Sequence, residues 1–257
     1  MASLRGSPSQ RLPDMAVVVA ARAVGDAWVV ATNTLLDRHG EAFDLLVEVE
    51  SPAIQASDEA ISRRLSRFLT DRGSQDVRRV ANTIFPSKLA RTSPTRPILY
   101  QRYLRLHDGL RRASPKNAKG LYFERLIRYP LQPDLSKANQ LETMIAGLRG
   151  SLLPGGLHHA YELQVFCPGK DARPRGFPCL SSISLHVDGQ RLRMAATYRN
   201  QYYVRKALGN FVGLSELQMW LATEAGLEQG PLSIHAFHAQ IDPDIGATSV
   251  RRLLVAA

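Results

Sequence analysis

The stretch 177–199, FPCLSSISLHVDGQRLRMAATYR, has the pattern of two β-strands joined by a tight turn. Apolar and polar residues alternate over 180–187 and over 191–199, as in strands that are buried on one face only. Asp188-Gly189 between them is typical of two-residue hairpin loops, because glycine readily adopts the positive φ angles of these turns. The stretch predicts an antiparallel hairpin, with Cys179 at the mouth of its first strand.

The pattern on both sides of this hairpin predicts an α+β domain with a largely antiparallel sheet packed against helices. Apolar runs predict further strands over 43–51, 160–168 and 232–242. Periodic apolar residues predict helices over 26–38, 57–73, 75–91, 98–112, 139–152 and 210–225. Gly40 ends the first of these helices and Gly226 the last. We expect a disordered, Pro- and Ser-rich leader over 1–14 and a single domain over 15–257.

Composition places the chain among proteins with one substantial core. It has 257 residues, of which 44% are hydrophobic. No apolar run approaches the roughly 20 residues of a membrane span, and no signal peptide is present, so we expect a cytoplasmic protein without a membrane partner. In that reducing compartment the two cysteines, Cys167 and Cys179, are expected as free thiols rather than as a disulfide.

The formal net charge of +10 predicts an anionic substrate or partner. The basic residues are scattered, and no zinc, helix-turn-helix or RNA-recognition motif accompanies them, so a merely solvated basic surface is an equal alternative. The segment 111–134 looks like a Gly- and Pro-rich loop in which basic residues alternate with Tyr122, Phe123 and Tyr129. It supports a second hypothesis, a non-catalytic nucleotide- or RNA-binding protein.

Four short motifs carry a resemblance over 139–242. They are Pro178-Cys179 before a strand, Tyr198-Arg199-Asn200 one hairpin later, Gly209-Asn210-Phe211 at a helix, and His238-Ala239-Gln240-Ile241-Asp242 in the last strand. At these spacings the thymidylate synthase family, which includes the pyrimidine nucleotide hydroxymethylases, has a Pro-Cys pair, Gln-Arg-Ser, Phe-Asn-Ile and Gly-Asp-x-His-x-Tyr. The second half of the chain therefore resembles that family.

The resemblance implies a thymidylate synthase-like fold and a homodimer formed by the backs of two sheets. It implies a transferase that methylates or hydroxymethylates carbon 5 of a pyrimidine nucleotide, with 5,10-methylenetetrahydrofolate as the one-carbon donor. Cys179 is the implied nucleophile, since a thiolate that adds to carbon 6 makes carbon 5 nucleophilic. Arg199 would lie close to this thiol, favour the thiolate and bind the substrate phosphate.

The resemblance also assigns substrate contacts, several of them at positions where the residue type differs from the family's. Asn210 matches the asparagine that binds the pyrimidine edge, which nominally favours uracil, although asparagine is equally a helix N-cap residue. Asn200, which follows Arg199 at the position of the serine in the family's Gln-Arg-Ser motif, is also expected to bind substrate. Tyr202 replaces the aspartate that faces folate, and Gln240 and Asp242 replace the histidine and tyrosine that bind the sugar hydroxyl.

Three further family positions change the expected chemistry. The paired arginines that cross to the neighbouring subunit's phosphate site correspond to His159 and Ala160. Either the nearby basic residues Lys170, Arg173 and Arg175 compensate for them, or the substrate lacks a simple 5′-monophosphate. The catalytic glutamate corresponds to Asn82 or Thr83, neither of which is a general base at neutral pH. Glu48 and Glu50 are possible substitutes, but alternating glutamates on a strand usually form its solvent face.

Overall fold

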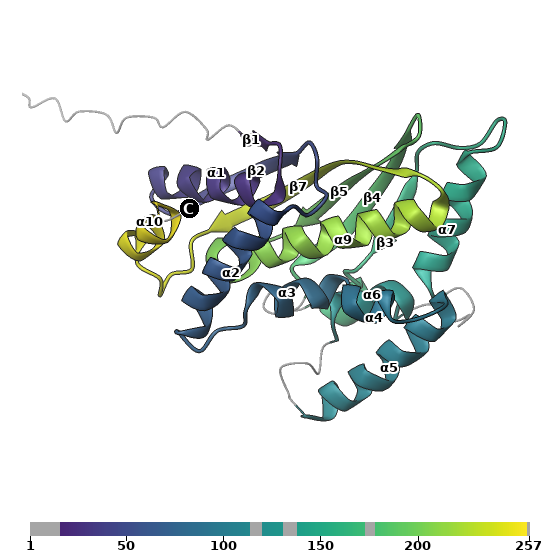
Figure 1. Ribbon diagram of the computed structural model, residues 1–257, viewed down its shortest axis with the longest axis horizontal. Coiled ribbons are helices and arrows are strands. Elements are labelled where there is room, and N and C mark those ends of the chain that lie inside the picture. The colour runs from purple at the N-terminus through teal and green to yellow at the C-terminus, as the bar shows by residue number, and fades with distance from the viewer. Residues whose placement is uncertain (1–15, 114–119, 131–137, 173–177, 256–257) are drawn as a thin grey trace, which may run out of the picture.

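The computed structural model describes residues 16–113, 120–130, 138–172 and 178–255, so the leader expected over 1–14 lies outside the described residues. Figure 1 labels most of the elements. The strands are β1 (Val17–Ala21), β2 (Glu41–Val49), β3 (Tyr161–Gln164), β4 (Leu180–Asp188), β5 (Arg191–Tyr198), β6 (Gln201–Tyr202) and β7 (Glu228–Gln240). The helices are α1 (Val24–Asp37), α2 (Ala56–Thr70), α3 (Val77–Ile84), α4 (Ser87–Arg91), α5 (Arg96–Ala113), α6 (Tyr122–Ile127), α7 (Gln140–Ser151), α8 (Pro168–Asp171), α9 (Leu208–Ala225) and α10 (Ala247–Val255), and a π-helical turn, η2 (Tyr203–Ala207), precedes α9.

The strands form one mixed sheet in the order β1-β2-β7-β5-β4-β3, and the short β6 pairs with β7. The predicted hairpin is confirmed: β4 and β5 are antiparallel, and Gly189 at their turn has a φ of 61°. β2 with β7 and β3 with β4 are also antiparallel. The remaining pairs are parallel: β1 pairs with β2, β5 pairs with β7, and β6 pairs with β7. The expectation of a largely antiparallel sheet therefore holds for only part of it.

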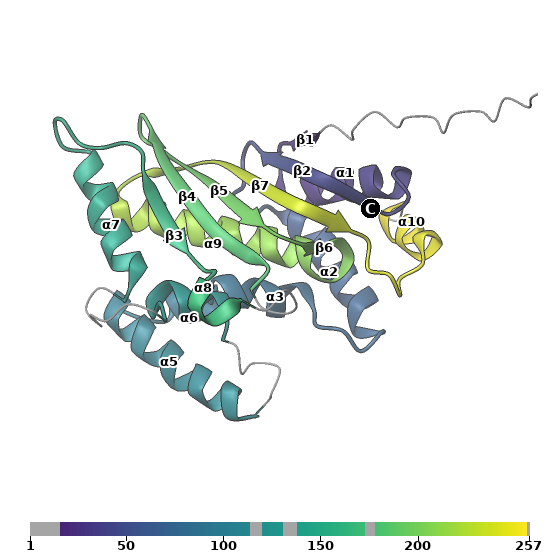
Figure 2. The ribbon, with the colours of Figure 1, turned by 180° about the vertical axis from the view of Figure 1, so that it is seen from behind.

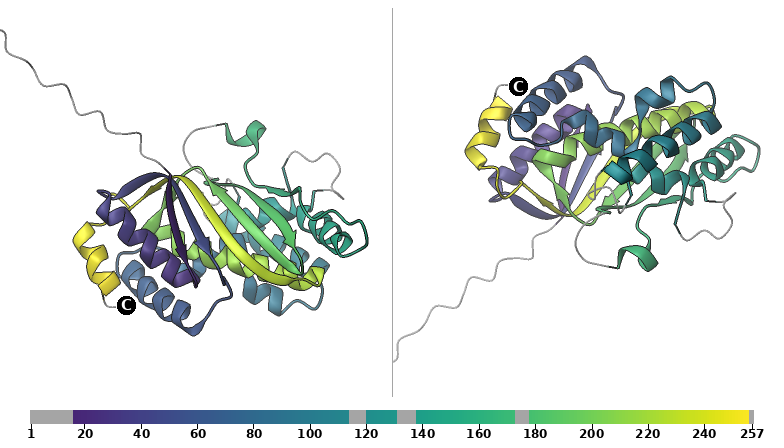
Figure 3. Two further views of the ribbon diagram at one scale, coloured as in Figure 1. Left: turned by 90° about the horizontal axis from the view of Figure 1, so that it is seen from above. Right: turned by 90° about the horizontal axis from the view of Figure 1, so that it is seen from below.

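Helices cover one face of the sheet. Figure 3 shows the sheet nearly edge-on with the long helices α1, α2 and α9 on one side, while the short α8 lies beyond the end of the sheet on the other side (Figure 2). Figure 2 looks onto the opposite face, over which no helix lies in the described part of the chain. Side-chain burial follows this division: Leu232 and Ile234 of β7 are fully buried, whereas Phe237 is 52% exposed. Phe43 of β2 (55% exposed) and Val18 of β1 (64% exposed) lie on the open face as well.

One cluster of buried apolar side chains runs from β1 to α10 and fills the space between the sheet and its helices. The most buried helix is α9, which packs on α3, β5 and β7. Its residues Gly209 and Gly213 let α3 approach closely: a Cβ on Gly209 would lie 2.5 Å from the Val80 Cβ. This contact brings the first turn of α9 beside α3. Gly226, with a φ of 79°, ends α9 as predicted.

Several elements differ from the expectations. The helix predicted over 75–91 is interrupted after Ile84, because Phe85 is extended and Pro86 begins a new short helix. The loop predicted over 111–134 contains α6, whose Phe123 and Leu126 are fully buried. β1 and α10 lie where no element was predicted.

The two cysteines are free, as predicted; Cys167 is buried and Cys179 is half-buried. No described helix combines the length and the apolar character needed to cross a membrane.

Candidate active site

Cys179 and Arg199 lie beside each other at one end of the hairpin. The β4–β5 ladder pairs Leu180 with Tyr198, and beyond it the backbone N–H of Arg199 donates a hydrogen bond to the Cys179 carbonyl oxygen (3.0 Å). The register of the hairpin thus fixes the two residues that were predicted to act together. The Arg199 side chain also hydrogen-bonds the Cys179 thiol, and its guanidinium carbon lies 6.0 Å from the centre of the Phe166 ring.

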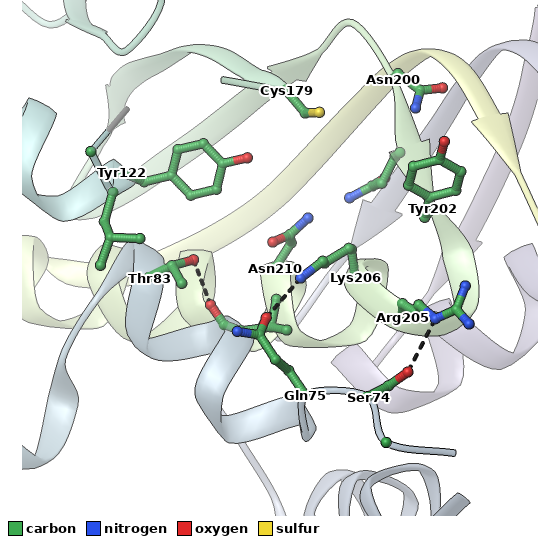
Figure 4. Close-up of a pocket in the computed structure, with 15 residues that line it drawn as sticks. Ser74, Gln75, Thr83, Tyr122, Cys179, Asn200, Tyr202, Arg205, Lys206 and Asn210 are labelled. Atoms are coloured by element: carbon green, nitrogen blue, oxygen red, sulfur yellow. Dashed lines mark hydrogen bonds between the residues drawn. The ribbon is translucent and has the colours of Figure 1, made fainter. Parts of the chain in front are cut away.

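Cys179 opens into a cavity of about 570 Å³ between the end of the sheet, η2 and α3. Of the predicted site residues, Cys179, Asn200, Tyr202 and Asn210 line this cavity. Figure 4 shows them around one space, together with Tyr122 and Lys206. The other lining residues are Gly73, Ser74, Gln75, Val80, Thr83, Gly120, Leu121, Gln201 and Arg205. A volume of this size is within the range of small-molecule sites.

The charges around Cys179 and its burial shift the pKa of the thiol in opposite directions. Burial raises the pKa of the thiol, while the positive charges of Arg199 and Lys206 and the hydrogen bond from Arg199 lower it. Burial is the larger effect, so the pKa of Cys179 lies above its ordinary value. Two cations beside a half-buried thiol nevertheless provide the charge that a thiolate needs when it forms.

Asn210 presents an amide to the cavity from the first turn of α9. Its side chain is 4% exposed and makes no hydrogen bond within the described part of the chain. The alternative of an N-cap is wrong here, because η2 runs into α9 at Leu208 and Asn210 lies inside the helix. The amide is therefore available to face a ligand that offers one donor and one acceptor.

Asn200 and Gln240 belong to one hydrogen-bonded group at the end of the sheet. Gln240 Nε2 donates to Asn200 Oδ1 (3.1 Å), and His238 Nδ1 lies 2.7 Å from the same oxygen. β6 lies beside β7 at this point, with Tyr202 paired to Gln240. Asn200 lines the cavity and Gln240 does not. Gln240 therefore acts indirectly, by holding the Asn200 side chain in position through their hydrogen bond.

The Asp242 carboxylate is hydrogen-bonded to the backbone of η2. Its Oδ2 accepts hydrogen bonds from the N–H groups of Val204 (3.0 Å) and Arg205 (3.1 Å), and Arg205 Nη1 reaches Oδ1 at 3.3 Å. The side chain is almost completely buried, and this burial raises the pKa of the carboxyl even though the N–H groups lower it. The prediction that Asp242 contacts a sugar does not fit this arrangement, because its oxygens already have partners and it does not line the cavity.

The position of the family's catalytic glutamate falls on α3. Thr83 lines the cavity, with its hydroxyl donating to the Val80 carbonyl oxygen (2.7 Å), and Asn82 is not among the lining residues. Glu48 and Glu50 are exposed and line a different depression with Arg22 and Arg193, so neither substitutes for that glutamate. The lining formed by the described residues contains no Asp or Glu.

The two residues expected to serve the neighbouring subunit lie elsewhere. His159 is exposed at the start of β3, where its ring stacks on His186 (6.5 Å between ring centres). His158 accepts from the Val187 N–H, which lies about 23 Å along β4 from Leu180 at the usual rise of a strand. His159 thus does not reach the cavity of its own chain. Arg175 lies outside the described residues.

Sequence reasoning missed several lining residues. Tyr122, on α6, is close enough to Cys179 for the two ionisations to influence each other, and burial raises the pKa of its phenol. Gln201 is 2% exposed, and neither of its amide atoms has a hydrogen-bond partner among the described residues. Lys206, on η2, donates to Gln75 Oε1 (2.9 Å). No local sequence pattern marks these residues as lining one cavity.

The segment behind the second hypothesis is largely built into the fold. Phe123 is fully buried and cannot stack on a base. Arg125 forms a buried, two-pronged ion pair with Asp171 (2.9 and 3.1 Å), and Arg128 pairs with Glu124 (2.6 Å). Their charges are compensated within the chain, which weakens the case for a nucleic-acid surface in this segment.

Comparison of the chain with models of known protein families gives no match, and comparison with curated protein sequences gives none at the level searched. The functional assignment therefore rests on the cavity and on the residues that line it.

Proposed function

We propose that the protein is a thymidylate synthase-like transferase that modifies carbon 5 of a pyrimidine nucleotide through addition of the Cys179 thiolate to carbon 6. The observation that carries the proposal is the convergence of Cys179, Asn200 and Asn210 at one cavity, although they come from separate parts of the sequence. Arg199 does not line the cavity, but its backbone N–H binds the Cys179 carbonyl oxygen. The resemblance gave these residues a common role before their positions were known.

The chemistry suits the residues. A thiol beside two cations can deliver a thiolate when substrate binds, and the Asn210 amide offers a donor and an acceptor to the edge of the ring. Asparagine at this position favours uracil over cytosine by the family pattern. Arg199 would hold the nucleotide phosphate, to which a forked guanidinium is well suited.

The lining fits folate poorly. A pteridine ring presents N–H donors for which a carboxylate is the natural acceptor, and the described lining has hydroxyl, amide and phenol groups but no carboxylate. Tyr202, at the position of the folate-facing aspartate, lines the cavity and is 38% exposed. We therefore propose a one-carbon donor at the oxidation level of an aldehyde, and leave methylenetetrahydrofolate as one candidate for it.

We further propose that two copies associate through their open sheet faces. Val18, Phe43 and Phe237 give this face apolar side chains that no described helix covers. A dimer there would bury on the order of 2,000 Å² or more. We propose that in this dimer His159, which does not reach its own cavity, contacts the cavity of the neighbouring chain.

The test is a covalent adduct. Incubation with a panel of 5-fluoropyrimidine nucleotides, with and without methylenetetrahydrofolate, should add the mass of one nucleotide to Cys179. Cys179→Ser should abolish the adduct, and Cys167→Ser, which changes a buried thiol outside the cavity, should keep it. Absence of an adduct from every nucleotide in the panel would reject the proposed function.

A further inference from the structure

The proposed reaction needs a group that removes the proton from carbon 5, and the cavity lining lacks the carboxylate expected for proton transfer. The described lining contains no Asp or Glu. Residues 114–119 and 173–177, which precede Gly120 and Pro178 in the sequence, contain none either. Two acids lie next to lining residues, and both have partners. Asp242 is held by two backbone N–H groups and by Arg205. Glu124, whose Oε2 would lie 2.7 Å from a Cβ on Gly120, pairs with Arg128 and His107. Among the described lining residues, a proton acceptor is therefore a side chain of another type.

Lys206 is the lining residue best placed for this role. Its side chain extends from η2 into the cavity, toward Gln75 and Asn210 (Figure 4), and its Nζ donates to the Gln75 oxygen at 2.9 Å. Gln75 is neutral, so it orients the amine without the negative charge that would favour the protonated form of Lys206. The neighbouring cation Arg205 is held away by Asp242, Asp244 and Ser74.

The alternatives are poorer acceptors. Burial raises the pKa of Tyr122, and Arg205 remains protonated throughout the accessible pH range. Burial lowers the pKa of Lys206, and so does the charge of Arg205; Asp242 and the Cys179 thiolate act in the opposite direction. The net shift is downward, so the neutral amine is reached at lower pH than in a free lysine.

We infer that Lys206 is the proton acceptor for carbon 5 of the pyrimidine ring, an inference that rests on the proposed function. The Cys179 sulfur bonds to carbon 6, and the electron pair of the 5,6 double bond moves onto carbon 5 and the adjacent carbonyl oxygen. Carbon 5 then bonds to the carbonyl carbon of an aldehyde donor, and the π electron pair of that C=O bond moves onto its oxygen, which takes a proton from water. The neutral Lys206 amine takes the carbon 5 proton, the C–H electron pair restores the double bond, and the sulfur leaves as thiolate. Water takes the proton from the ammonium, and hydroxymethyl transfer needs no reductant.

Two assays separate this role from the function itself. The 5-fluoropyrimidine adduct needs the thiolate but no proton acceptor, because its carbon 5 carries fluorine. Exchange of the carbon 5 hydrogen of an unmodified pyrimidine nucleotide for deuterium, followed by proton NMR in D₂O without a one-carbon donor, needs both. The extent of adduct at completion, rather than its rate, is compared, since loss of Lys206 also removes a charge that favours the thiolate.

The decisive variant is Lys206→Arg, which keeps the positive charge and cannot give a neutral base. We expect Lys206→Arg and Lys206→Met to form the adduct but to lose deuterium exchange about a hundredfold or more. Lys88→Met, which changes an exposed lysine on α4, should match the wild type in both assays. Exogenous methylamine should partly restore exchange in Lys206→Met.

Exchange by Lys206→Arg at the wild-type rate would overturn the inference and leave the proposed function standing. A wild-type protein that forms neither adduct nor exchange product with any pyrimidine nucleotide would reject both. If Lys206→Met does not fold, as judged by circular dichroism, the Arg variant and the wild-type pH profile decide: the exchange rate per unit of adduct must rise with pH and level off above the pKa of Lys206.

Discussion

The carboxylate of Asp242 holds the backbone N–H and the guanidinium of Arg205 at the same time, at 3.1 and 3.3 Å. One buried acid thus fixes both the path of η2 and the position of the Arg205 guanidinium beside the cavity that this residue lines. Asp244 binds the same guanidinium from the exposed side (2.5 Å).

Asp242→Ala should therefore destabilise the fold by about 3 kcal/mol, since it leaves two N–H groups without partners and an arginine without its buried counter-charge. Asp244→Ala, which removes only the exposed partner, should leave the midpoint of urea unfolding nearly unchanged. Equal midpoints for the two variants would show that Asp242 is not the anchor of η2.

Gly209→Ala should be destabilising in spite of the higher helix propensity of alanine. The added Cβ would lie 2.5 Å from the Val80 Cβ and 2.9 Å from the Val77 carbonyl oxygen, so α9 and α3 must separate. We expect a loss of about 1–3 kcal/mol in urea unfolding, with a reduced yield of the Cys179 adduct because Asn210 moves. Gly109→Ala, in α5 with no atom within 4 Å of the new Cβ, should instead gain about 0.5–1 kcal/mol. A neutral Gly209→Ala would contradict the close packing of the two helices.

The alkylation of Cys179 should require alkaline pH. Because burial raises the pKa of this thiol, the thiolate fraction at any given pH is smaller than in a free cysteine. Its reaction with iodoacetamide should therefore reach half its limiting rate at higher pH than a cysteine peptide does. Lys206→Met, which removes one of the two charges that lower the pKa, should shift the profile further upward. Cys179→Ser reports the background from buried Cys167. A profile below that of the peptide would mean that the two cations outweigh burial.

The open sheet face should hold two chains together. One chain has a mass of 28.5 kDa, and light scattering at micromolar concentration should give a mass twice as large. Phe237→Lys should give monomers, because it places a charge in the centre of the proposed contact, whereas Leu106→Lys, at a 58% exposed position on α5, should remain dimeric. A wild-type monomer would remove both the dimer and the cross-subunit role of His159.

The features that were predicted correctly depend on local chemistry. The Asp188-Gly189 turn and the Gly226 cap each need a backbone angle that glycine provides, so their sequence suffices to locate them. The proximity of Cys179 and Arg199 was predicted from the family resemblance and not from the turn, since a register shift between Leu180 and Ser182 changes which residues of the hairpin lie opposite each other.

What the sequence did not reveal depends on distant parts of the chain. α6 lies within a stretch rich in breakers, and its Phe123 contacts the rings of Phe85 and Tyr103 from other helices. β1 is a short run that forms a strand only beside β2. The role of Asp242 could not be inferred, because its partners follow from the course of η2. Lys206 faces the cavity for the same reason, and no local pattern indicates that a chain will leave the α-helical path there.

The central position of β7 sets a limit on how this protein can fold as it is synthesised. β7 joins β2 on one side and β5 on the other, and Glu41 pairs with Gln240 from nearly the other end of the described chain. Until residues 228–240 leave the ribosome, the amino-terminal strands and the hairpin have no common neighbour and expose their edges. Contacts of such long sequence separation form slowly. Between the emergence of the hairpin at residue 198 and that of β7 at residues 228–240, the nascent chain therefore carries two unjoined sheet fragments, the state in which chaperones would bind it and in which it is most prone to aggregate.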